Sequence, residues 1–575
     1  MKNKFITALN ELGVNYDKLE INDFILSDHT ILENHILYYK DMPSGLSYVS
    51  HLVEFNEAIK DHQFNVVGTM IDLSRNAVFK VDYFKHVIRK QASLGYNEIW
   101  LYMEDVYELT NYPKFGYLRG RYSKEELIEL VSYANLFGIS LIPCIQTLGH
   151  MGQFLRWFSN TKLKDQPDIL LPENDSVFEL IKEMLSTMKY IFKSNKIHIG
   201  MDETFGHGLG RYYKLNSFKN PKQIFLDHLK KVNDLCLKEG FEEVCVWSDM
   251  FFRTASQTDS YYDPTIKFPI ELLNQIPKNI TLVYWDYYNS DISLVKKMLE
   301  NHISMDRKVI MASGTWLWTK LNYDKNKTDA TAPVHIKAAL DLGIKDIILT
   351  QWNDDGAYCD YETNYLGLFD MMNVMKSNTL NTDYLSRINL ISYENLVLAS
   401  NINALGFSPV HALWDDILLG IYANQFVGYE YQLLDPVIDA LKSYVLGLEN
   451  RGLENTEYLA RLLKAKLSFR RHFIRAYKEK TSFNQALEAL NEIDLYIPLV
   501  NKSLTKHWHE RNKVFGLEVL QNRIYAQLSR TIEARYIINA YANQMIDRID
   551  FLEEVIVKEP YLPVKYIDVA LSSKQ

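Results

Sequence analysis

The sequence has few cysteines and no long apolar run. It contains four cysteines in 575 residues, Cys144, Cys236, Cys245 and Cys359, and no CxxC pair. This pattern argues against both a disulfide scaffold and a structural zinc site, so we expect reduced thiols. No stretch is apolar enough to span a bilayer, and charged residues interrupt the N-terminus before any apolar core of signal-peptide length. We therefore expect a soluble, cytoplasmic protein with no membrane partner.

The sequence also lacks a cluster of basic charge. Its net charge is -9, and its Lys and Arg residues are scattered rather than gathered into a stripe. This excludes the electrostatic footprint of a nucleic-acid-binding protein and favours a neutral or weakly charged small-molecule ligand. A chain of 575 residues, 47% of them hydrophobic, exceeds the size at which one core stops growing, so we expect two or more domains.

What the sequence does contain is a repeated pattern between about residues 64 and 375. Eight short β-branched or aromatic runs alternate with longer stretches of helical spacing, such as residues 84–95 and 272–279. The runs cover residues 65–75, 98–105, 140–150, 196–203, 243–250, 280–288, 308–316 and 346–355. Alternation of this kind is typical of a parallel βα fold, and eight units predict an α/β protein with a (β/α)8 TIM barrel.

The regions on either side of this pattern differ from it. Residues 1–63 are mixed and short, which predicts an N-terminal cap segment on the barrel. Beyond residue 376 long helical periods dominate, as in the series Val514, Leu517, Ile524, Leu528 and Ile532. We therefore expect three parts: an N-terminal segment over 1–63, a catalytic barrel over 64–375 and an all-α C-terminal domain over 376–575.

Polar and aromatic residues gather at the ends of the eight runs. Because the C-terminal ends of the strands form the active-site face of a TIM barrel, these side chains are expected to converge on one mouth. Five of the nine tryptophans lie near the ends of the last four runs: Trp247, Trp285, Trp316, Trp318 and Trp352. Aromatic walls around convergent carboxylates suit a sugar ring. Trp100 and Trp157 lie elsewhere and are expected to be packing residues.

The fourth run ends in two adjacent acids, Asp202 and Glu203, whereas the seventh run, VIMASGTWLW, offers no carboxylate. Retaining glycosidases that form a covalent enzyme intermediate need two carboxylates about 5 Å apart, and in the common barrel type these come from strands 4 and 7. A sugar with a 2-acetamido group avoids this need, because its carbonyl oxygen attacks the anomeric carbon itself. We predict that Glu203 is the acid/base and that ionised Asp202 orients the acetamido group and raises the pKa of Glu203.

Four motifs in chain order carry a resemblance to a known family. They are IDLSR on the first run, QTLGH on the third, HIGMDE on the fourth and a tryptophan at the end of the eighth. Together they resemble the catalytic domain of glycoside hydrolase family 20, the β-N-acetylhexosaminidases, and most closely the intracellular bacterial members with a helical C-terminal domain. The resemblance implies an exo-acting retaining enzyme that removes terminal β-linked GlcNAc or GalNAc through an oxazolinium intermediate, with no cofactor.

The resemblance also implies roles for further side chains. Arg75 would bind hydroxyls of the terminal sugar far from the leaving group, with Asp354 accepting a hydroxyl hydrogen bond beside it. His150 would support the acid, and Glu104 or Asp105 would be the second-strand carboxylate of the site. Three tryptophans would line the pocket for the acetamido methyl group and the sugar face: Trp247, Trp285 and Trp352.

The sequence departs from the family pattern at two strand ends. Many members have a tyrosine at the end of strand 7 that donates a hydrogen bond to the acetamido oxygen, where this chain has SGTWLW. Either Trp316 or Trp318 supplies an indole N–H instead, or Tyr287 or Tyr288 reaches across, and we favour Tyr287. Strand 8 usually ends in Trp-x-Glu, whereas this chain has two adjacent aspartates, so the one that contacts the sugar stays open.

Other functions fit the sequence less well. A chitinase-like family 18 enzyme would carry D-x-x-D-x-D-x-E on strand 4, which KIHIGMDE does not match. A carbohydrate-binding barrel without catalysis would not need both acids, and no Gly-rich phosphate loop follows the last two runs. WNDDGAYCDYE lacks the ligand order of a calcium loop, and His507 and His509 fall on different faces of a helix. We therefore expect no metal.

Overall fold

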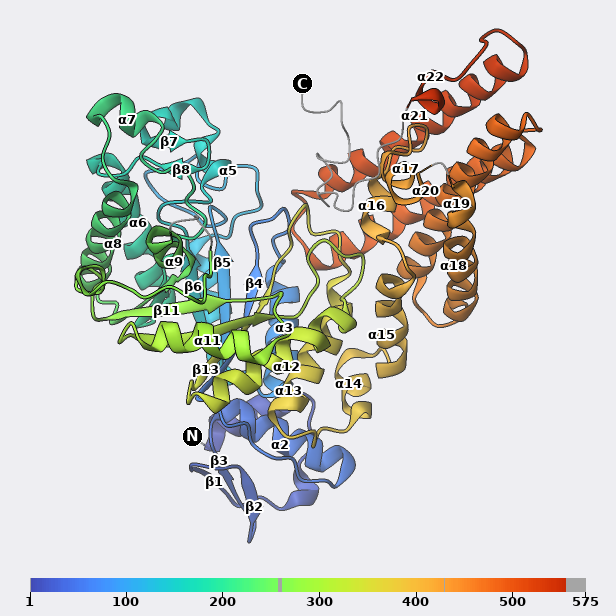
Figure 1. Cartoon of the computed structure of the whole chain (residues 1–575). Coiled ribbons are helices and arrows are strands. Elements are labelled where there is room, and N and C mark those ends of the chain that lie inside the picture. The colour runs from blue at the N-terminus through green and yellow to red at the C-terminus, as the bar shows by residue number, and fades with distance from the viewer. Residues whose placement is uncertain (1, 257–260, 429, 555–575) are drawn as a thin grey trace.

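The computed structural model describes residues 2–256, 261–428 and 430–554. Its centre is a closed barrel of eight parallel strands, with neighbours in the order β10-β11-β12-β13-β4-β5-β6-β9 (Figure 1). The strands are β4 (Val66–Asp72), β5 (Glu98–Met103), β6 (Ser140–Ile145), β9 (Lys196–His198), β10 (Glu243–Trp247), β11 (Ile280–Trp285), β12 (Lys308–Gly314) and β13 (Asp346–Gln351). Each strand lies within one of the eight predicted runs, so the TIM barrel is confirmed.

Helices follow the strands and surround the barrel. They include α3 (Val81–Leu94), α4 (Lys124–Leu136), α6 (Asp175–Phe192), α8 (Pro221–Lys238), α9 (Asp249–Ala255), α11 (Ile292–Ile303), α12 (Lys325–Asp341) and α13 (Tyr365–Met375). Local chemistry fixes several starts: Ser123 and Glu126 form a capping box on α4, and Pro221 is the first residue of α8. The helix predicted over 272–279 is limited to α10 (Ile270–Leu273), because Pro277 disfavours a helical conformation at the preceding residue.

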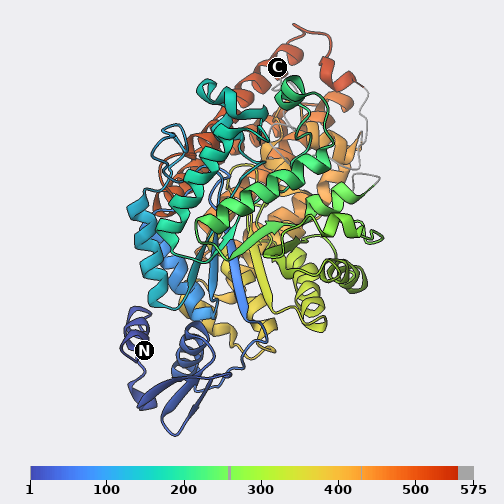
Figure 2. The ribbon, with the colours of Figure 1, turned by 90° about the vertical axis from the view of Figure 1, so that its left-hand side faces the viewer.

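The N-terminal segment lies at the end of the barrel opposite the strand C-termini (Figure 2). It consists of α1 (Lys2–Glu11), β1 (Asp23–Leu26), β2 (Ile31–Glu33), β3 (Ile36–Tyr39) and α2 (Met42–Phe55), with the strands in the order β1-β3-β2. Asn97, just before β5, donates from Nδ2 to Oδ2 of Asp41, the N-cap of α2, at 3.0 Å. This contact fixes the segment to the N-terminal ends of the strands and leaves the mouth of the barrel open.

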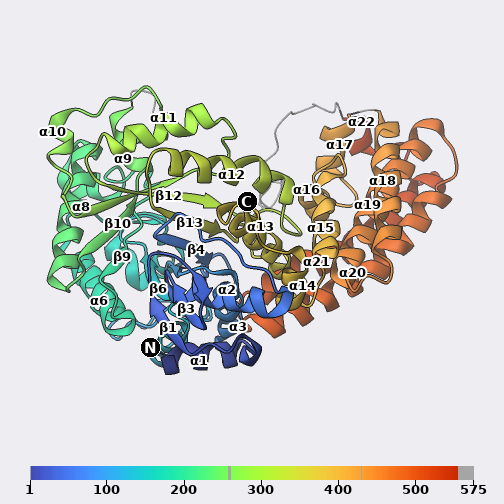
Figure 3. The ribbon, with the colours of Figure 1, turned by 90° about the horizontal axis from the view of Figure 1, so that it is seen from below.

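The chain after the barrel is helical and has its own apolar core. Its helices are α14 (Thr382–Asn389), α15 (Tyr393–Ser400), α16 (Pro409–Trp414), α17 (Ile421–Val427), α18 (Asp435–Leu448), α19 (Glu454–Glu479), α20 (Asn484–Arg511), α21 (Leu517–Ala542) and α22 (Asp550–Glu553). They stand beside the barrel (Figure 3). The end of α20 and the link to α21 meet the barrel, where Arg511 pairs with Asp360 at 2.6 Å and Asn512 bridges to Phe79. The start of α21 is thereby held near the barrel mouth.

The barrel interior holds a separate aromatic layer around Trp100, Tyr102, Trp247 and Trp352. The four cysteines are free thiols. Among the described helices, none is both long and apolar enough to cross a membrane.

Candidate active site

The shortest barrel strand, β9, delivers the two adjacent acids to the mouth through a tight turn. Gly200 has φ 72°, and a Cβ at this position would lie 2.1 Å from Oε1 of Gln146, so only glycine fits. Met201 and Glu203 also have positive φ, at 70° and 49°, and so does His150 at 54°. Left-handed backbone at non-glycine residues is uncommon and gathers at functional sites. The turn brings the Asp202 and Glu203 side chains to the same cavity.

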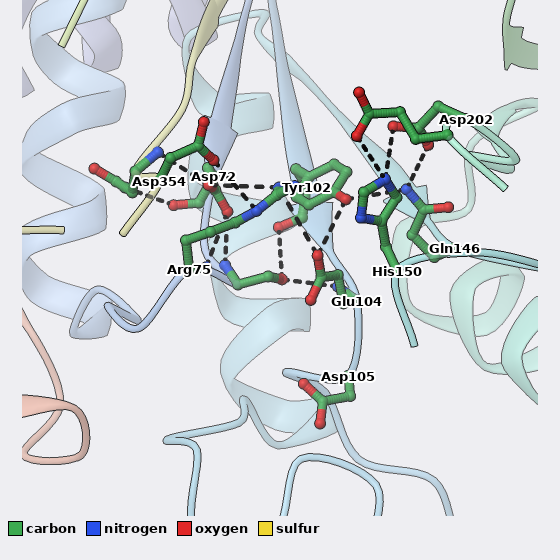
Figure 4. A network of polar contacts seen from close by, with 12 residues as sticks. Asp72, Arg75, Tyr102, Glu104, Asp105, Gln146, His150, Asp202 and Asp354 are labelled. Carbon is green, nitrogen blue, oxygen red and sulfur yellow. Dashed lines mark hydrogen bonds and ion pairs between the residues drawn. The ribbon is translucent and has the colours of Figure 1, made fainter. Parts of the chain in front are cut away.

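Asp202 is buried and held by two partners (Figure 4). Gln146 donates from Nε2 to Oδ1 of Asp202 at 2.8 Å, and the His150 Nε2 atom lies 3.1 Å from Oδ2. Gln146 is itself fixed, because its Oε1 accepts from the Met201 N–H at 3.2 Å. Burial raises the pKa of Asp202, but the charge and hydrogen bond of His150 and the Gln146 amide outweigh burial and hold the pKa low. Asp202 is therefore ionised at neutral pH.

The pKa of Glu203 is shifted in the opposite direction to that of Asp202. Its side chain is 40% exposed, and one carboxylate oxygen lies 3.7 Å from Nε2 of His150. Tyr261 donates its hydroxyl proton to the other oxygen at 3.2 Å. Burial, followed by the negative charge of Asp202, raises the pKa of Glu203. Adjacent carboxyl groups whose pKa values are driven apart are typical of an acid and an anion in one reaction.

His150 completes this group as a cation. Burial lowers the pKa of its imidazole, but the negative charge of Asp202 outweighs burial and raises the pKa to about 9. The ring therefore carries a proton at neutral pH and lies between the two acids.

Replacing His150 with asparagine is expected to move the alkaline limb of kcat/KM to higher pH by roughly one unit. The imidazolium lowers the pKa of Glu203, and its loss leaves burial and the Asp202 charge opposed only by the Tyr261 hydrogen bond and the Arg75 charge. An acid must be protonated to act, so a higher pKa extends activity upward in pH. pH profiles measure the shift, with the exposed His35→Asn as the control. An unchanged limb, or one moved to lower pH, would contradict this arrangement.

The far end of the cavity is built around Arg75. Its Nε atom lies 3.5 Å from Asp354, and its Nη1 atom lies 3.8 Å from Glu104 and 3.6 Å from Asp72. Nη1 is buried and makes no hydrogen bond in the structure. Burial raises the pKa of Glu104, against the attraction of Arg75. A buried guanidinium that keeps a donor unused among carboxylates is well suited to bind sugar hydroxyls.

Aromatic rings wall the cavity between these two ends. The Arg75 guanidinium lies over the rings of Tyr102 and Trp352, at 4.7 and 4.8 Å from their centroids. Trp285 and Tyr287 stack with centroids 5.6 Å apart. The cavity has a volume of about 110 Å³ and is lined by Arg75, Asp202, Glu203, Trp247, Trp285, Tyr287, Tyr288, Trp318, Trp352 and Asp354.

Four residues predicted for the site lie outside its lining: Glu104, Asp105, His150 and Trp316. Glu104 and His150 still contact the lining residues Arg75 and Asp202. Asp105 turns away from the cavity (Figure 4), because successive side chains at a strand end point to opposite sides. It pairs with Arg119 at 3.0 Å. Glu104 is thus the one of the two that faces Arg75. Trp316 lies behind Trp318, with ring centroids 4.1 Å apart, and supports that ring instead of lining the cavity. At the end of β13, Asp354 lines the cavity and Asp355 pairs with Arg523.

Four polar residues of the site were not predicted from the sequence. Gln146 lies in the QTLGH motif, and Asp249 lies two residues after the fifth strand, so both had a positional signal. Tyr102 accepts a hydrogen bond from Gln146 and donates to Glu104, but a tyrosine inside a strand gives no such signal. Tyr261 comes from a loop, and nothing in the sequence places it beside Glu203.

Asp249 holds the backbone of the acid. It is fully buried at the start of α9, and its Oδ2 accepts the Glu203 N–H at 3.0 Å. Burial, followed by the charge of Asp202, raises the pKa of Asp249 well above its usual range, which keeps the side chain neutral. The left-handed turn at Glu203 therefore depends on an uncharged acceptor beneath it.

Replacing Asp249 with alanine is expected to lower the free energy of unfolding by about 1–3 kcal/mol, because the buried Glu203 N–H loses its acceptor. It is also expected to lower kcat roughly tenfold, through misplacement of the acid. Asp249→Asn keeps the acceptor and is expected to retain the wild-type pH profile. Urea unfolding and pH profiles measure both variants. If Asp249 were charged, the asparagine variant would lower the pKa of Glu203 and move the alkaline limb to lower pH.

The described residues contain no group of three or more His, Cys, Asp or Glu side chains placed to hold a metal ion.

The fold and the paired acids define a glycoside hydrolase built on a TIM barrel. The model of the glycosyl hydrolase family 20 catalytic domain matches residues 64–368, and that of the Glycoside Hydrolase 20C C-terminal domain matches residues 400–564. Because the first match covers more than half of the chain, the protein belongs to glycosyl hydrolase family 20.

Individual relatives are distant. Hexosaminidase D of Bos taurus is 25% identical over 246 residues, which cover 42% of this chain and 66% of that protein. Hexosaminidase D of Homo sapiens is 24% identical over 230 residues, covering 38% and 44%. The chain thus spans less than two thirds of the length of these curated relatives. A solved β-N-acetylhexosaminidase from Bacteroides fragilis has 16% identity and a TM-score of 0.47, with 61% of this chain and 78% of that chain covered.

Proposed function

We propose that the protein is an exo-acting retaining β-N-acetylhexosaminidase that removes terminal β-linked GlcNAc or GalNAc by substrate-assisted catalysis. The observation that carries the proposal is the pair of adjacent acids with opposite pKa shifts, Asp202 lowered and Glu203 raised. The end of β12, where a protein nucleophile would come from, supplies tryptophans instead of a carboxylate. The nucleophile must then come from the substrate.

In the proposed reaction the acetamido carbonyl oxygen attacks the anomeric carbon while Glu203 donates its proton to the glycosidic oxygen. The bond between the anomeric carbon and that oxygen breaks, and an oxazolinium forms. Asp202 accepts a hydrogen bond from the acetamido N–H and balances its growing positive charge. Ionised Glu203 then takes a proton from water, and the water oxygen opens the oxazolinium with overall retention.

The cavity walls supply the remaining contacts in this proposal. Trp247, Trp285 and Trp352 surround the acetamido methyl group and the sugar face. Tyr287, whose pKa is raised by burial and which therefore keeps its proton, donates to the acetamido oxygen in place of a strand-7 tyrosine. Arg75, with Glu104 and Asp354 beside it, binds the hydroxyls at the opposite end of the sugar.

We also propose the division of the chain into a segment over 1–63, a catalytic part over 64–375 and a helical part over 376–575. The barrel begins with β4 and the helices that cover it end with α13 at Met375, which supports these limits. A cytoplasmic location is part of the proposal, supported by four cysteines that form no disulfide.

The proposal is tested by comparing hydrolysis of p-nitrophenyl β-GlcNAc, β-GalNAc and β-glucoside. The first two are expected to be hydrolysed and the glucoside to be inert, because it has no acetamido oxygen. Proton NMR of the first-formed sugar is expected to show the β-anomer. Equal rates on GlcNAc and glucose substrates would overturn the mechanism, and no turnover of any of them would favour a binding protein.

A further inference from the structure

The turn that follows β13 has an unusual backbone. Asp355, Gly356 and Ala357 have φ values of 64°, 121° and 58°, so three successive residues have positive φ. Such a backbone is uncommon at residues other than glycine and persists where the surrounding structure holds it. Asp354, which lines the active-site cavity 3.5 Å from Nε of Arg75, immediately precedes these residues (Figure 4). Its position therefore depends on what holds the turn.

The barrel fixes the start of this turn. The backbone N–H of Asn353 donates to Oδ2 of Asp72 at 2.9 Å, and the Asn353 Nδ2 donates to the Asp72 carbonyl oxygen at 2.8 Å. Asp72 ends β4 and is buried. The carbonyl oxygen of Asn353 accepts the N–H groups of Gly356 and Ala357 at 3.3 and 3.1 Å. Asn353 is thus a fixed point, and Asp354 lies in the corner that follows it.

The helical region after the barrel holds the other side of the turn. Arg523 of α21 donates from Nη1 to the carbonyl oxygen of Asp355 at 2.7 Å and from Nη2 to its Oδ1 at 3.2 Å. The two side chains are 16% and 6% exposed, so solvent screens this pair little. The guanidinium also lies 5.6 Å from the ring centroid of Trp414, in the helical region. Because a guanidinium presents its donors in fixed directions, Arg523 sets both the place and the orientation of Asp355.

A second contact joins the helical region to the residue after Arg75. Asn76 has φ 87°, and its Nδ2 donates to the carbonyl oxygens of Gly356 at 3.1 Å and Gly516 at 2.8 Å. Gly516 is the N-cap residue of α21, and a Cβ there would lie 2.4 Å from the Asn76 carbonyl oxygen, so the two backbones touch. Arg75 and Asp354 thus each precede a residue that is bound to the helical region.

We propose that Arg523 is a positioning residue of the active site, which acts through Asp355 to hold Asp354 beside Arg75 where a distal sugar hydroxyl binds. The inference rests on the proposed function and makes the helical region part of the apparatus that binds the terminal sugar. Arg523 lies outside the lining of the active-site cavity, so its effect on the sugar is indirect. The Asp354 carboxylate is 37% exposed, and a released turn lets it swing into solvent.

The test uses Arg523→Ala in the full chain. This variant is expected to raise KM for p-nitrophenyl β-GlcNAc roughly tenfold and to change kcat less than about twofold, because a contact made equally in the ground and transition states is lost. The matched control is Arg530→Ala on the same helix. Arg530 pairs with Asp416 at 2.7 Å inside the helical region, so its loss removes a similar ion pair without reaching the barrel. Thermal melts establish that each variant folds.

Substrates that lack one distal hydroxyl separate positioning from a general loss of structure. The 3-, 4- and 6-deoxy analogues of p-nitrophenyl β-GlcNAc are compared with the parent substrate. Where the missing hydroxyl is the one that Asp354 binds, wild type has already lost the contact, so Arg523→Ala is expected to lower kcat/KM less than about threefold further. A merely structural role of Arg523 would lower kcat/KM by the same factor on every substrate.

A milder variant covers the case in which the alanine protein does not fold. Arg523→Lys keeps the charge and the aliphatic stem but cannot donate in two fixed directions. It is expected to raise KM for the parent substrate roughly threefold, and this effect should vanish on the same deoxy analogue.

A wild-type KM in the folded Arg523 variant, or an equal loss on all four substrates, would overturn the positioning role, while wild-type hydrolysis of p-nitrophenyl β-GlcNAc upholds the proposed function. If the wild type hydrolyses none of them, the proposed function fails. Calorimetric titration of wild type and variant with N-acetylglucosamine and its deoxy analogues then decides the positioning role alone. Weaker binding by the variant, with a deficit that shrinks on one analogue, supports the role. Equal or undetectable binding by both proteins overturns it.

Discussion

Glutamine in place of Glu203 is expected to lower kcat/KM for an N-acetylhexosamine-terminated disaccharide by roughly 10⁴-fold, while kcat/KM for 2,4-dinitrophenyl β-GlcNAc falls less than about tenfold. Glutamine has nearly the same shape but no acidic proton. A sugar leaving group must be protonated as the bond breaks, whereas a dinitrophenolate leaves unprotonated. The raised pKa of Glu203 keeps this proton available to wild type near neutral pH.

Steady-state kinetics on a series of aryl glycosides with different leaving groups measures the effect. The control is Glu271→Gln, a change at an exposed glutamate of α10. In the variant, log kcat/KM is expected to depend steeply on the leaving-group pKa. A loss of the same size for every leaving group would show that Glu203 is not the acid.

The second large effect is expected at Asp202. Asparagine in its place should lower kcat by roughly 10²–10³-fold with little change in KM, because the lost interaction is strongest when the acetamido nitrogen becomes positive in the transition state. The change also removes the charge that raises the pKa of His150, so burial is left to lower that pKa and the imidazolium loses its proton nearer neutrality.

An N-acyl series tests this role directly. Wild-type rates are expected to fall from N-acetyl to N-trifluoroacetyl substrates, because fluorine makes the carbonyl oxygen a weaker nucleophile. Asp306→Asn, at an exposed aspartate, serves as the control. Equal rates on the N-acetyl and N-trifluoroacetyl substrates would contradict substrate assistance. An Asp202→Asn variant with wild-type kcat would remove Asp202 from the reaction.

The barrel and the acid pair were predictable because they depend on local pattern. Apolar runs that end in polar residues mark parallel strands, and strand ends converge whatever the details of the helices. The choice between Glu104 and Asp105 was not predictable, because it depends on the phase of the pleat at the strand end. Arg119, from a later loop, then pairs with the carboxylate that faces away.

Contacts between residues far apart in the sequence were also not predictable, because local patterns do not encode them. Tyr261 reaches Glu203 from a loop 58 residues away in the sequence, and no periodicity encodes that approach. In the helical part, the series from Val514 to Ile532 predicted helical structure, but it does not mark a single buried face. Val514 precedes α21 and is 58% exposed, and Ile532 is 69% exposed, because the bundle buries other positions of that helix.

The brevity of β9 has a consequence for how activity is lost on heating. Its register with β6 is a single pair, Cys144 opposite His198, whereas β5 and β6 share six. The contact between β6 and β9 thus has the fewest backbone pairings in the barrel, and it lies just before the two acids. The free energy of local opening should be lowest there. Amide hydrogen exchange over residues 196–203 is expected to be faster than in β4 and β5. Thermal inactivation should then precede the loss of helical circular dichroism, because the catalytic turn opens before the barrel unfolds.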